Sequence, residues 1–180
     1  MSGYTVDWPD AEYHQVLPNL YLGGHVWEEG GRSKSGKHST ISEDKSWDYV
    51  VSSYLDGDYE KTLPQCDMRL VLFNDTEKGL SEEIWEKIRS AVDEIVSRWR
   101  RGQKVLVRCQ AGYNRSGMLM CLTLMQMGLT AEDAIKTVRK RRGQHVLINR
   151  VFEGYVRERE VEYRDQASLA GTMAIAGDLL

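Results

Sequence analysis

VRCQAGYNRSG, residues Val107 to Gly117, lies between two apolar segments of different pattern. Lys104 to Val107 is a short β-branched run typical of a buried parallel strand, and Met118 to Met127 is almost wholly apolar, which is typical of a buried helix. A loop that leads from a strand into a helix N-terminus binds anions, because successive backbone N–H groups point inward and the helix dipole adds about half a positive charge. The stretch therefore predicts an anion site.

The side chains of this loop add chemistry to the predicted anion site. Arg115, at its end, carries a planar fork that can hold two oxygens of a phosphate. Cys109, at its start, lies in a positive field that favours the nucleophilic thiolate near neutral pH. The Cys-x5-Arg spacing alone could arise by chance around a core cysteine, but the preceding strand, Gly112, the Ser116 hydroxyl and the following helix support the functional interpretation. We therefore predict an anion cradle with a nucleophile at its base.

The loop resembles the Cys-x5-Arg signature of cysteine-dependent phosphatases, and Gly112-Tyr113-x-Arg115-Ser116 is most similar to the dual-specificity protein phosphatases. The sequence departs from that family at one position, because Arg108 stands where the family has His immediately before the cysteine. Side chains alternate along a strand, so we expect Arg108 to point away from Cys109.

A second match to the family follows a predicted strand, Met68 to Phe73. Asn74-Asp75-Thr76 comes directly after it, and the carboxyl ends of parallel strands meet at one edge of a sheet, so Asp75 and the Cys109 loop are expected to meet there. Asp75 could simply end the strand in a turn, but the segment resembles the family's general-acid loop. The resemblance makes Asp75 the proton donor to the leaving oxygen. Weaker candidates for that role are Asp56, Asp58 and Asp67.

The remaining segments predict an α/β fold with a central, mostly parallel sheet of four to five strands flanked by helices. Residues 1–15 are expected to form a loosely ordered arm. Further strands are predicted at Val16 to Gly24, with a Pro-Asn turn, and at Tyr49 to Tyr54. Helices are predicted from Ser81 to Gly102, after Thr130, and from Ile148 to Tyr163. The first of these carries a core-facing stripe of Ile84, Ile88, Val92, Ile95 and Trp99. We expect one phosphatase domain over residues 1–166 and a flexible tail over 167–180.

Three features allow two interpretations each. Residues 28–46 form a long polar stretch, either a lid in which Arg32, Lys34 and Lys37 attract a phosphorylated partner or, as we favour, a solvated insertion. Cys66 could resolve an oxidised Cys109, although a structural role is favoured. The third feature is a basic run, either a docking patch or the favoured solvated helix face. Its members are Lys136, Arg139, Lys140, Arg141 and Arg142.

Composition and charge narrow the partners, the compartment and the cofactors that we expect for this protein. A formal net charge of -3 argues against nucleic acid and anionic membrane as partners. No stretch reaches transmembrane length and the N-terminal residues lack a signal-peptide pattern, so we expect a cytoplasmic protein. The 3 cysteines fit a reducing compartment and lack metal-ligand spacing, and we expect neither metal nor other cofactor.

The resemblance implies hydrolysis of phosphate monoesters on phosphotyrosine and phosphoserine/threonine proteins or peptides. In this scheme Cys109 attacks phosphorus and forms a cysteinyl-phosphate, Asp75 is the general acid and then the base, and Ser116 donates a hydrogen bond to the departing sulfur. Arg115 and the loop amides hold the phosphoryl oxygens. The residues expected to bind phosphate are Gln110, Ala111, Gly112, Tyr113, Asn114 and Arg115. Two alternatives remain open: an RNA 5′-triphosphatase of the same superfamily, and a non-catalytic phosphate-binding module.

Overall fold

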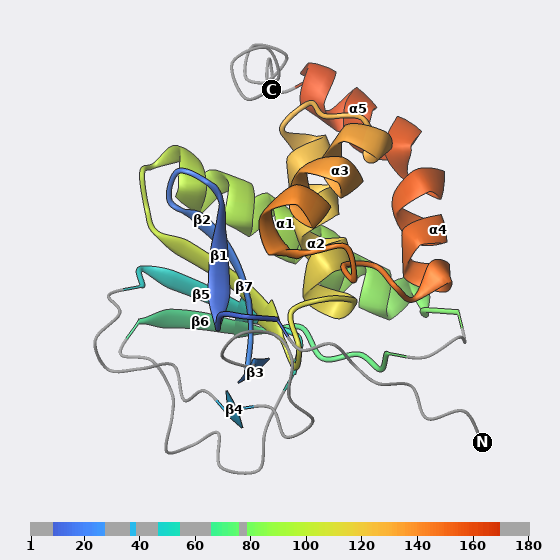
Figure 1. The fold of residues 1–180 in the computed structure, drawn as a ribbon. Coiled ribbons are helices and arrows are strands. Elements are labelled where there is room, and N and C mark those ends of the chain that lie inside the picture. Colours follow the sequence, from blue (N-terminus) through green and yellow to red (C-terminus); the bar gives the residue numbers. More distant parts are fainter. Residues whose placement is uncertain (1–8, 28–36, 39–46, 55–65, 76–78, 170–180) are drawn as a thin grey trace, which may run out of the picture.

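A computed structural model of the chain describes residues 9–27, 37–38, 47–54, 66–75 and 79–169. Its main feature is a five-stranded sheet in the order β1-β2-β7-β5-β6, in which only the edge pair β1–β2 is antiparallel (Figure 1). The strands span Tyr13–Leu17 (β1), Leu20–Gly24 (β2), Tyr49–Ser52 (β5), Asp67–Leu70 (β6) and Val105–Cys109 (β7). The predicted α/β class with a mostly parallel central sheet is confirmed. A separate two-stranded ribbon pairs β3 (Val26–Trp27) with β4 (Lys37–His38).

The strand predicted over Val16 to Gly24 is in fact a hairpin. β1 begins at Tyr13, inside the region expected to be a loose arm, and pairs with β2 across the turn at Pro18-Asn19. Asn19 has φ 62°, the left-handed conformation that asparagine tolerates in tight turns. Apolar residues flank Pro18-Asn19 directly on both sides, so the sequence alone did not separate the two strands.

β7 is the central strand, and its residues are buried throughout. Side chains alternate between the two faces of the sheet: Val105 and Val107 pack in the large core with the helices, whereas Leu106 packs with Trp47 and Val50 on the other face. By the same alternation Cys109 lies on the helix side and Arg108 on the opposite side. The predicted direction of Arg108 therefore agrees with the strand geometry.

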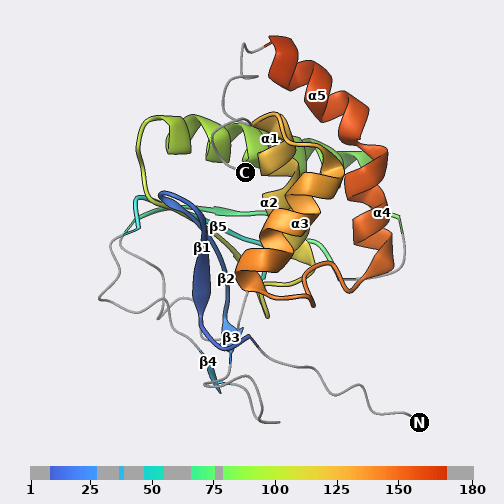
Figure 2. The same ribbon diagram turned by 45° about the horizontal axis from the view of Figure 1, so that its top comes forward.

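Helices α1 to α5 gather on one side of the sheet (Figure 2). Their bounds are Glu82–Arg100 (α1), Arg115–Gln126 (α2), Ala131–Arg142 (α3), Arg150–Glu158 (α4) and Glu160–Leu169 (α5). Ser81 caps α1 by accepting a hydrogen bond from the Ile84 N–H at 3.3 Å, and Thr130 caps α3 in the same way at Asp133, as the capping patterns predicted. In the predicted stripe of α1, Ile88, Val92 and Ile95 are fully buried.

The C-terminal part of the chain differs from the prediction at two points. The single helix expected over Ile148 to Tyr163 is two helices, α4 and α5, which meet at Arg159, the C-cap of α4. The flexible tail was expected from residue 167, but α5 continues to Leu169, and Ala167 is 2% exposed in the core. A small residue buried against neighbours orders the chain where its weak pattern suggested fraying. Residues 170–180 lie outside the described part of the chain.

Candidate active site

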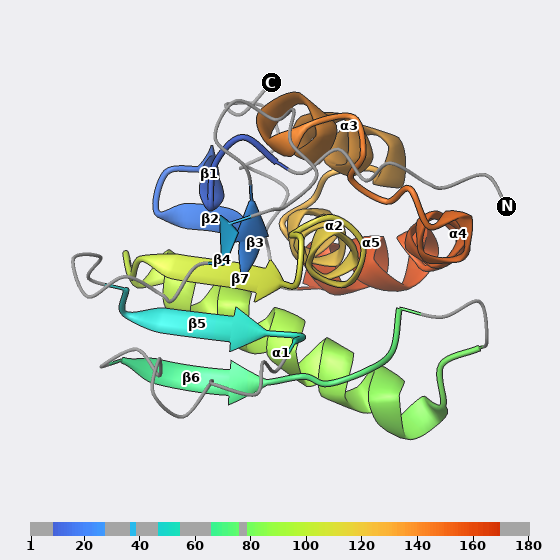
Figure 3. The ribbon, with the colours of Figure 1, turned by 60° about the horizontal axis from the view of Figure 1, so that its bottom comes forward.

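Cys109 ends β7 at the carboxyl edge of the sheet, and α2 begins six residues later at Arg115 (Figure 3). The Cys109 side chain is 2% exposed, and the Ser116 hydroxyl donates a hydrogen bond to its sulfur over 3.1 Å. The strand, the loop and the first turn of the helix thus place the sulfur and Ser116 together, as the spacing predicted.

The carbonyl groups of the loop are held by the surrounding protein. The carbonyl oxygen of Cys109 accepts from the His25 N–H at 3.1 Å, that of Tyr113 from Leu147 at 3.1 Å, and that of Asn114 from Met118 at 2.8 Å. In a trans peptide the N–H of the next residue points opposite to the carbonyl. Since these carbonyls face outward, the following N–H groups turn toward the inside of the loop, where an anion would lie.

Arg142 supplies contacts to two further carbonyls of the loop, a role that the sequence analysis did not predict. Its guanidinium donates to the carbonyl oxygens of Ala111 at 3.0 Å and Gly112 at 3.4 Å, and to that of Ala11 at 2.9 Å. The side chain is buried, and this burial lowers its pKa to about 10. Arg142 is therefore neither a docking residue nor part of a solvated face: it braces the loop from behind.

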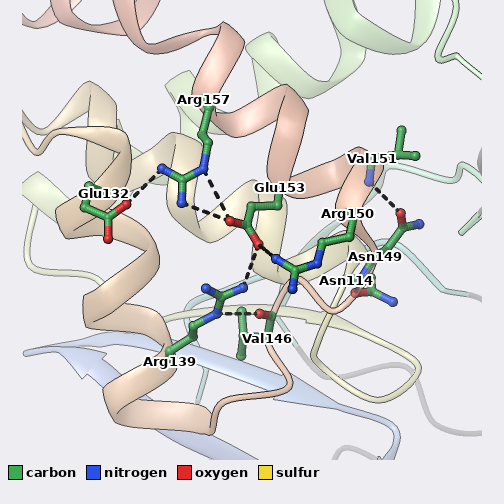
Figure 4. A network of polar contacts seen from close by, with 9 residues as sticks. All are labelled: Asn114, Glu132, Arg139, Val146, Asn149, Arg150, Val151, Glu153 and Arg157. Atoms are coloured by element: carbon green, nitrogen blue, oxygen red, sulfur yellow. Dashed lines mark hydrogen bonds and ion pairs between the residues drawn. The ribbon is translucent and has the colours of Figure 1, made fainter.

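The other members of the basic run are of two kinds, exposed side chains and a side chain bound within the fold. Lys136, Lys140 and Arg141 are exposed, as a solvated face requires. Arg139 instead donates to the Glu153 carboxylate at 2.8 Å and to the Val146 carbonyl at 3.0 Å, within a cluster that joins α3 to α4 (Figure 4). Three members of the run are thus on the surface, whereas Arg139 and Arg142 form hydrogen bonds with other parts of the fold.

Two glycines allow the anion loop to pack closely against β2. The sequence analysis did not include β2 in the site. A Cβ on Gly24 would lie 2.5 Å from the carbonyl carbon of Ala111, and a Cβ on Gly112 would lie 2.5 Å from the Gly23 carbonyl oxygen. Gly112 also has φ 74°, where side chains are strained. The pair Gly23-Gly24 at the end of a strand was the available signal for a close approach of two backbones.

Arg115 is oriented by the end of β5. Its Nη1 donates to the Ser53 carbonyl at 3.1 Å, and its guanidinium lies 5.4 Å from the centre of the Tyr54 ring. Its Nε is buried and has no hydrogen-bond partner among the residues that the structure places. A cavity of about 640 Å³ opens beside Arg115, with Phe73 and Leu80 on its wall. The Arg115 guanidinium therefore has N–H groups available to donate hydrogen bonds to a ligand.

Asp75 meets the loop, although it is 34 residues before Cys109 in the chain. Its Oδ2 accepts from Asn114 Nδ2 and its Oδ1 from Asn149 Nδ2, both at 2.8 Å. The rival Asp67 begins β6 and pairs with Arg98 at 2.8 Å, at the far end of the strand from Asp75. Asp56, Asp58 and Thr76 lie outside the described residues. Of the placed candidates, Asp75 is the one that contacts the loop.

The other two cysteines lie away from Cys109. β5 pairs Tyr49 with both Asp67 and Val105, so Cys66 lies level with the residue before β7, about 16 Å along the sheet from Cys109 at roughly 3.3 Å per residue. That separation exceeds the reach of a disulfide, which excludes Cys66 as a direct resolving partner in this conformation. Burial and Asp67 raise the pKa of the Cys66 thiol, while Arg108 opposes them. Burial in α2 likewise raises the pKa of Cys121.

The parts of the chain placed in the structure contain no cluster of three or more His, Cys, Asp or Glu side chains that could hold a metal ion. None of the helices described is both long enough and apolar enough to cross a membrane. Within the polar stretch 28–46, β4 is placed and carries Lys37; Arg32 and Lys34 lie outside the described residues.

Comparison with known proteins identifies the family. The model of the dual specificity phosphatase catalytic domain matches residues 34–162. The chain belongs to this family. No curated protein matches the chain. The match covers the anion loop and Asp75, so the resemblance read from these motifs is confirmed at the level of the family.

Solved dual-specificity-phosphatase-like structures share the fold. The human tyrosine phosphatase-like serine/threonine/tyrosine-interacting protein is 20% identical, covers 84% of this chain and 97% of its own, and has a TM-score of 0.62. PTPMT1 is 18% identical over 87% of this chain and 99% of its own, with a TM-score of 0.65. Human DUSP28 is 17% identical over 84% and 95%, with a TM-score of 0.63. At these identities the likeness concerns the fold.

Proposed function

We propose that this member of the dual-specificity phosphatase family hydrolyses phosphate monoesters on phosphotyrosine and phosphoserine/threonine proteins through a cysteinyl-phosphate intermediate. One observation carries the proposal: the loop carbonyls from Cys109 to Asn114 accept hydrogen bonds from outside the loop, at Cys109, Ala111, Gly112, Tyr113 and Asn114. This arrangement turns the N–H groups inward around a sulfur that already accepts from Ser116. Such a ring of donors suits a dianionic phosphate in contact with a nucleophile.

In the first step the Cys109 thiolate attacks phosphorus, an S–P bond forms, and the bond from phosphorus to the leaving oxygen breaks. The charge on the equatorial oxygens is held by the loop N–H groups and by the Arg115 fork. Protonated Asp75 gives its proton to the leaving oxygen, so that an alcohol or phenol departs.

In the second step water attacks the phosphocysteine. Asp75, now a carboxylate, takes a proton from that water, an O–P bond forms and the S–P bond breaks. The Ser116 hydroxyl, 3.1 Å from the sulfur, donates to the thiolate as it departs. Inorganic phosphate leaves, and the enzyme returns to its starting protonation state.

The Cys109→Ser variant tests the proposal. The wild-type protein and this variant are assayed on para-nitrophenyl phosphate, phosphotyrosine and phosphoserine peptides, a phosphoinositide and a 5′-triphosphorylated RNA, with a metal chelator present. We expect the wild type to hydrolyse the aryl phosphate and the peptides, and Cys109→Ser to lose turnover while it retains affinity for the phosphopeptide.

Three results would contradict the proposal. Hydrolysis by Cys109→Ser would remove the nucleophile from the mechanism. Phosphopeptide binding without turnover in the wild type would indicate a binding module. Turnover confined to the RNA or to the lipid would assign a different substrate class.

A further inference from the structure

A series of hydrogen bonds connects a histidine of β1 to the anion loop through Arg142. The Arg142 guanidinium donates to the carbonyls of Ala111 at 3.0 Å and Gly112 at 3.4 Å. Its Nη1 lies 2.9 Å from Nδ1 of His14, and the other ring nitrogen of His14 lies 3.1 Å from Asp10 Oδ1. The series therefore leads from the exposed Asp10 through His14 and the buried Arg142 to the loop backbone.

These contacts require a neutral His14 ring. A guanidinium only donates hydrogen bonds, so Nδ1 of His14 accepts from Arg142 and the ring proton lies on Nε2, where it faces the Asp10 carboxylate. Protonation would place an N–H on Nδ1, 2.9 Å from a guanidinium N–H, and would bring two positive charges together. The hydrogen bond between His14 and Arg142 thus exists in only one protonation state of the ring.

The groups around His14 favour the neutral ring. Burial and the charge of Arg142 lower the pKa of His14, although Asp10 opposes them. β2 pairs Leu22 with His14 and carries no charged side chain. The ring side chain is 25% exposed, so it can exchange protons with solvent. The other titratable groups nearby act on Arg142 itself, and they are Glu12, Tyr113 and Cys109.

We propose that neutral His14 is a positioning residue of the anion loop, which holds Arg142 on the loop carbonyls, and that protonation of His14 weakens anion binding by the loop. The inference rests on the proposed function, because it concerns the regulation of the same loop. A protonated ring would form an ion pair with Asp10, which keeps the ring in place. The repulsion then acts on Arg142, and the carbonyls of Ala111 and Gly112 lose their donor.

The binding experiment uses sulfate and the Cys109→Ser protein between about pH 5 and 8, the range in which histidine titrates. Sulfate stays a dianion over this range and the variant has no thiolate, so neither the ligand nor the nucleophile changes its charge. NMR shifts of the loop amides measure the sulfate affinity. We expect it to fall by about fivefold or more in acid, a typical coupling between two sites. The growing positive charge of the protein by itself would tighten sulfate binding, so the sign identifies the effect.

His14→Asn, added to the Cys109→Ser protein, separates hydrogen bonding from titration. The asparagine Oδ1 replaces Nδ1 as an acceptor for Arg142, but the amide does not titrate. We expect this variant to keep the affinity measured at high pH and to lose the fall in acid. A merely structural His14 would instead give a lower affinity at every pH.

His145→Asn is the matched control, because His145 is a second histidine beside the loop, with its ring 5.9 Å from the ring of Tyr113. It should leave the fall in sulfate affinity unchanged. An affinity that does not fall in acid, or a fall that persists in His14→Asn, would overturn the proposal. A fall that disappears only in His145→Asn would assign the effect to the other histidine.

An NMR titration of the His14 ring without sulfate tests the contact directly. Its midpoint should lie below that of an ordinary histidine and should rise in Arg142→Met, because the charge that opposes protonation is gone. An unmoved midpoint would overturn the contact. The outcomes also separate this inference from the proposed function: sulfate binding without pH dependence overturns the role of His14 alone, whereas no sulfate binding at any pH overturns the anion site and the proposed function with it.

Discussion

At the scale of single residues, the shape of the anion loop depends on groups that lie behind it. Arg142 carries a buried positive charge behind the anion loop, and Gly24 allows β2 to approach the loop backbone. Both act by fixing the path of residues 110–112, and hence the direction of the N–H groups that would meet a phosphate. The surrounding protein thus fixes the shape of the anion loop.

Gly24→Ala should displace the loop. The added Cβ would lie 2.5 Å from the Ala111 carbonyl carbon, and backbone cannot yield as the tip of a side chain does. We expect kcat/KM on para-nitrophenyl phosphate to fall by about 10²-fold, since a shift near 1 Å has that effect on a preorganised site. Gly154→Ala in α4 is the control: its Cβ meets nothing within 4 Å, and alanine in a helix should add up to about 1 kcal/mol of stability. Wild-type kinetics in Gly24→Ala would refute the close packing.

Arg142→Met should lower the free energy of unfolding by about 2–5 kcal/mol, because it leaves the carbonyls of Ala111 and Gly112 buried without their donor. It should also weaken competitive inhibition by inorganic phosphate, since the loop amides lose their fixed direction. Denaturant unfolding and inhibition assays measure the two effects. Arg141→Met, at an exposed neighbouring position, should change neither, and a similar result for both variants would contradict the bracing role.

At the scale of elements, α3 and α4 are joined by a charge cluster around Glu153 (Figure 4). Its carboxylate accepts from Arg139 at 2.8 Å, from Arg157 at 2.9 Å and from Arg150 at 3.2 Å, although Glu153 is only 8% exposed. Burial opposes ionisation, but the hydrogen bonds from Arg157 and Arg139 prevail and lower the pKa of Glu153. The cluster holds α4, and with it Asn149, in place.

Glu153→Gln should destabilise the protein by about 1.5–3 kcal/mol at neutral pH, the contribution of hydrogen bonds between charged groups. A lowered folded-state pKa means that this contribution is present above the unfolded value near 4.5 and is lost as the pH falls through the folded value. The difference in unfolding free energy between wild type and variant should therefore shrink below about pH 4.5. Glu132→Gln, at an exposed partner of Arg157, should cost less than about 1 kcal/mol, and a pH-independent Glu153→Gln effect would argue against ionic bonding.

At the scale of the whole molecule, the proposed reaction joins three distant segments. Cys109, the proposed nucleophile, ends β7, and Asp75, the proposed acid, follows β6. Asn149, which donates to Asp75, precedes α4 and lies 74 residues after Asp75 in the chain. The parallel arrangement of β5, β6 and β7 brings the first two to one edge of the sheet, and the packing of α4 on α2 brings the third. These groups, which are distant in the sequence, therefore lie close together because of the fold.

Asp75→Asn should reveal whether the general acid lies at this meeting point. The variant should lose activity, because asparagine cannot supply a proton to the leaving oxygen. The loss should approach about 10²–10⁴-fold on alkyl phosphates such as phosphoserine and shrink on activated aryl esters. Steady-state kinetics across a series of leaving groups measure this dependence. A small, uniform loss would mean that Asp75 only shapes the loop.

The sequence by itself determined the local parts of this protein. The β-branched run of β7, the apolar run of α2 and the caps at Ser81 and Thr130 follow from contacts within a few residues, so pattern alone predicts them. The chemistry of Cys109 to Ser116 is equally local. The α/β class and the family followed from these elements.

Only the tertiary structure decided which residues support the site. Arg142 looked like one more charge on a basic helix, and Asn149 like the start of a helix, because nothing nearby in the chain shows that their partners lie 31 and 74 residues away. The hairpin at Asn19, by contrast, pairs strands that are neighbours in the chain, and its Pro-Asn turn was part of the sequence prediction. The buried Ala167 was missed because its packing in the core overrides the weak preferences of the local sequence.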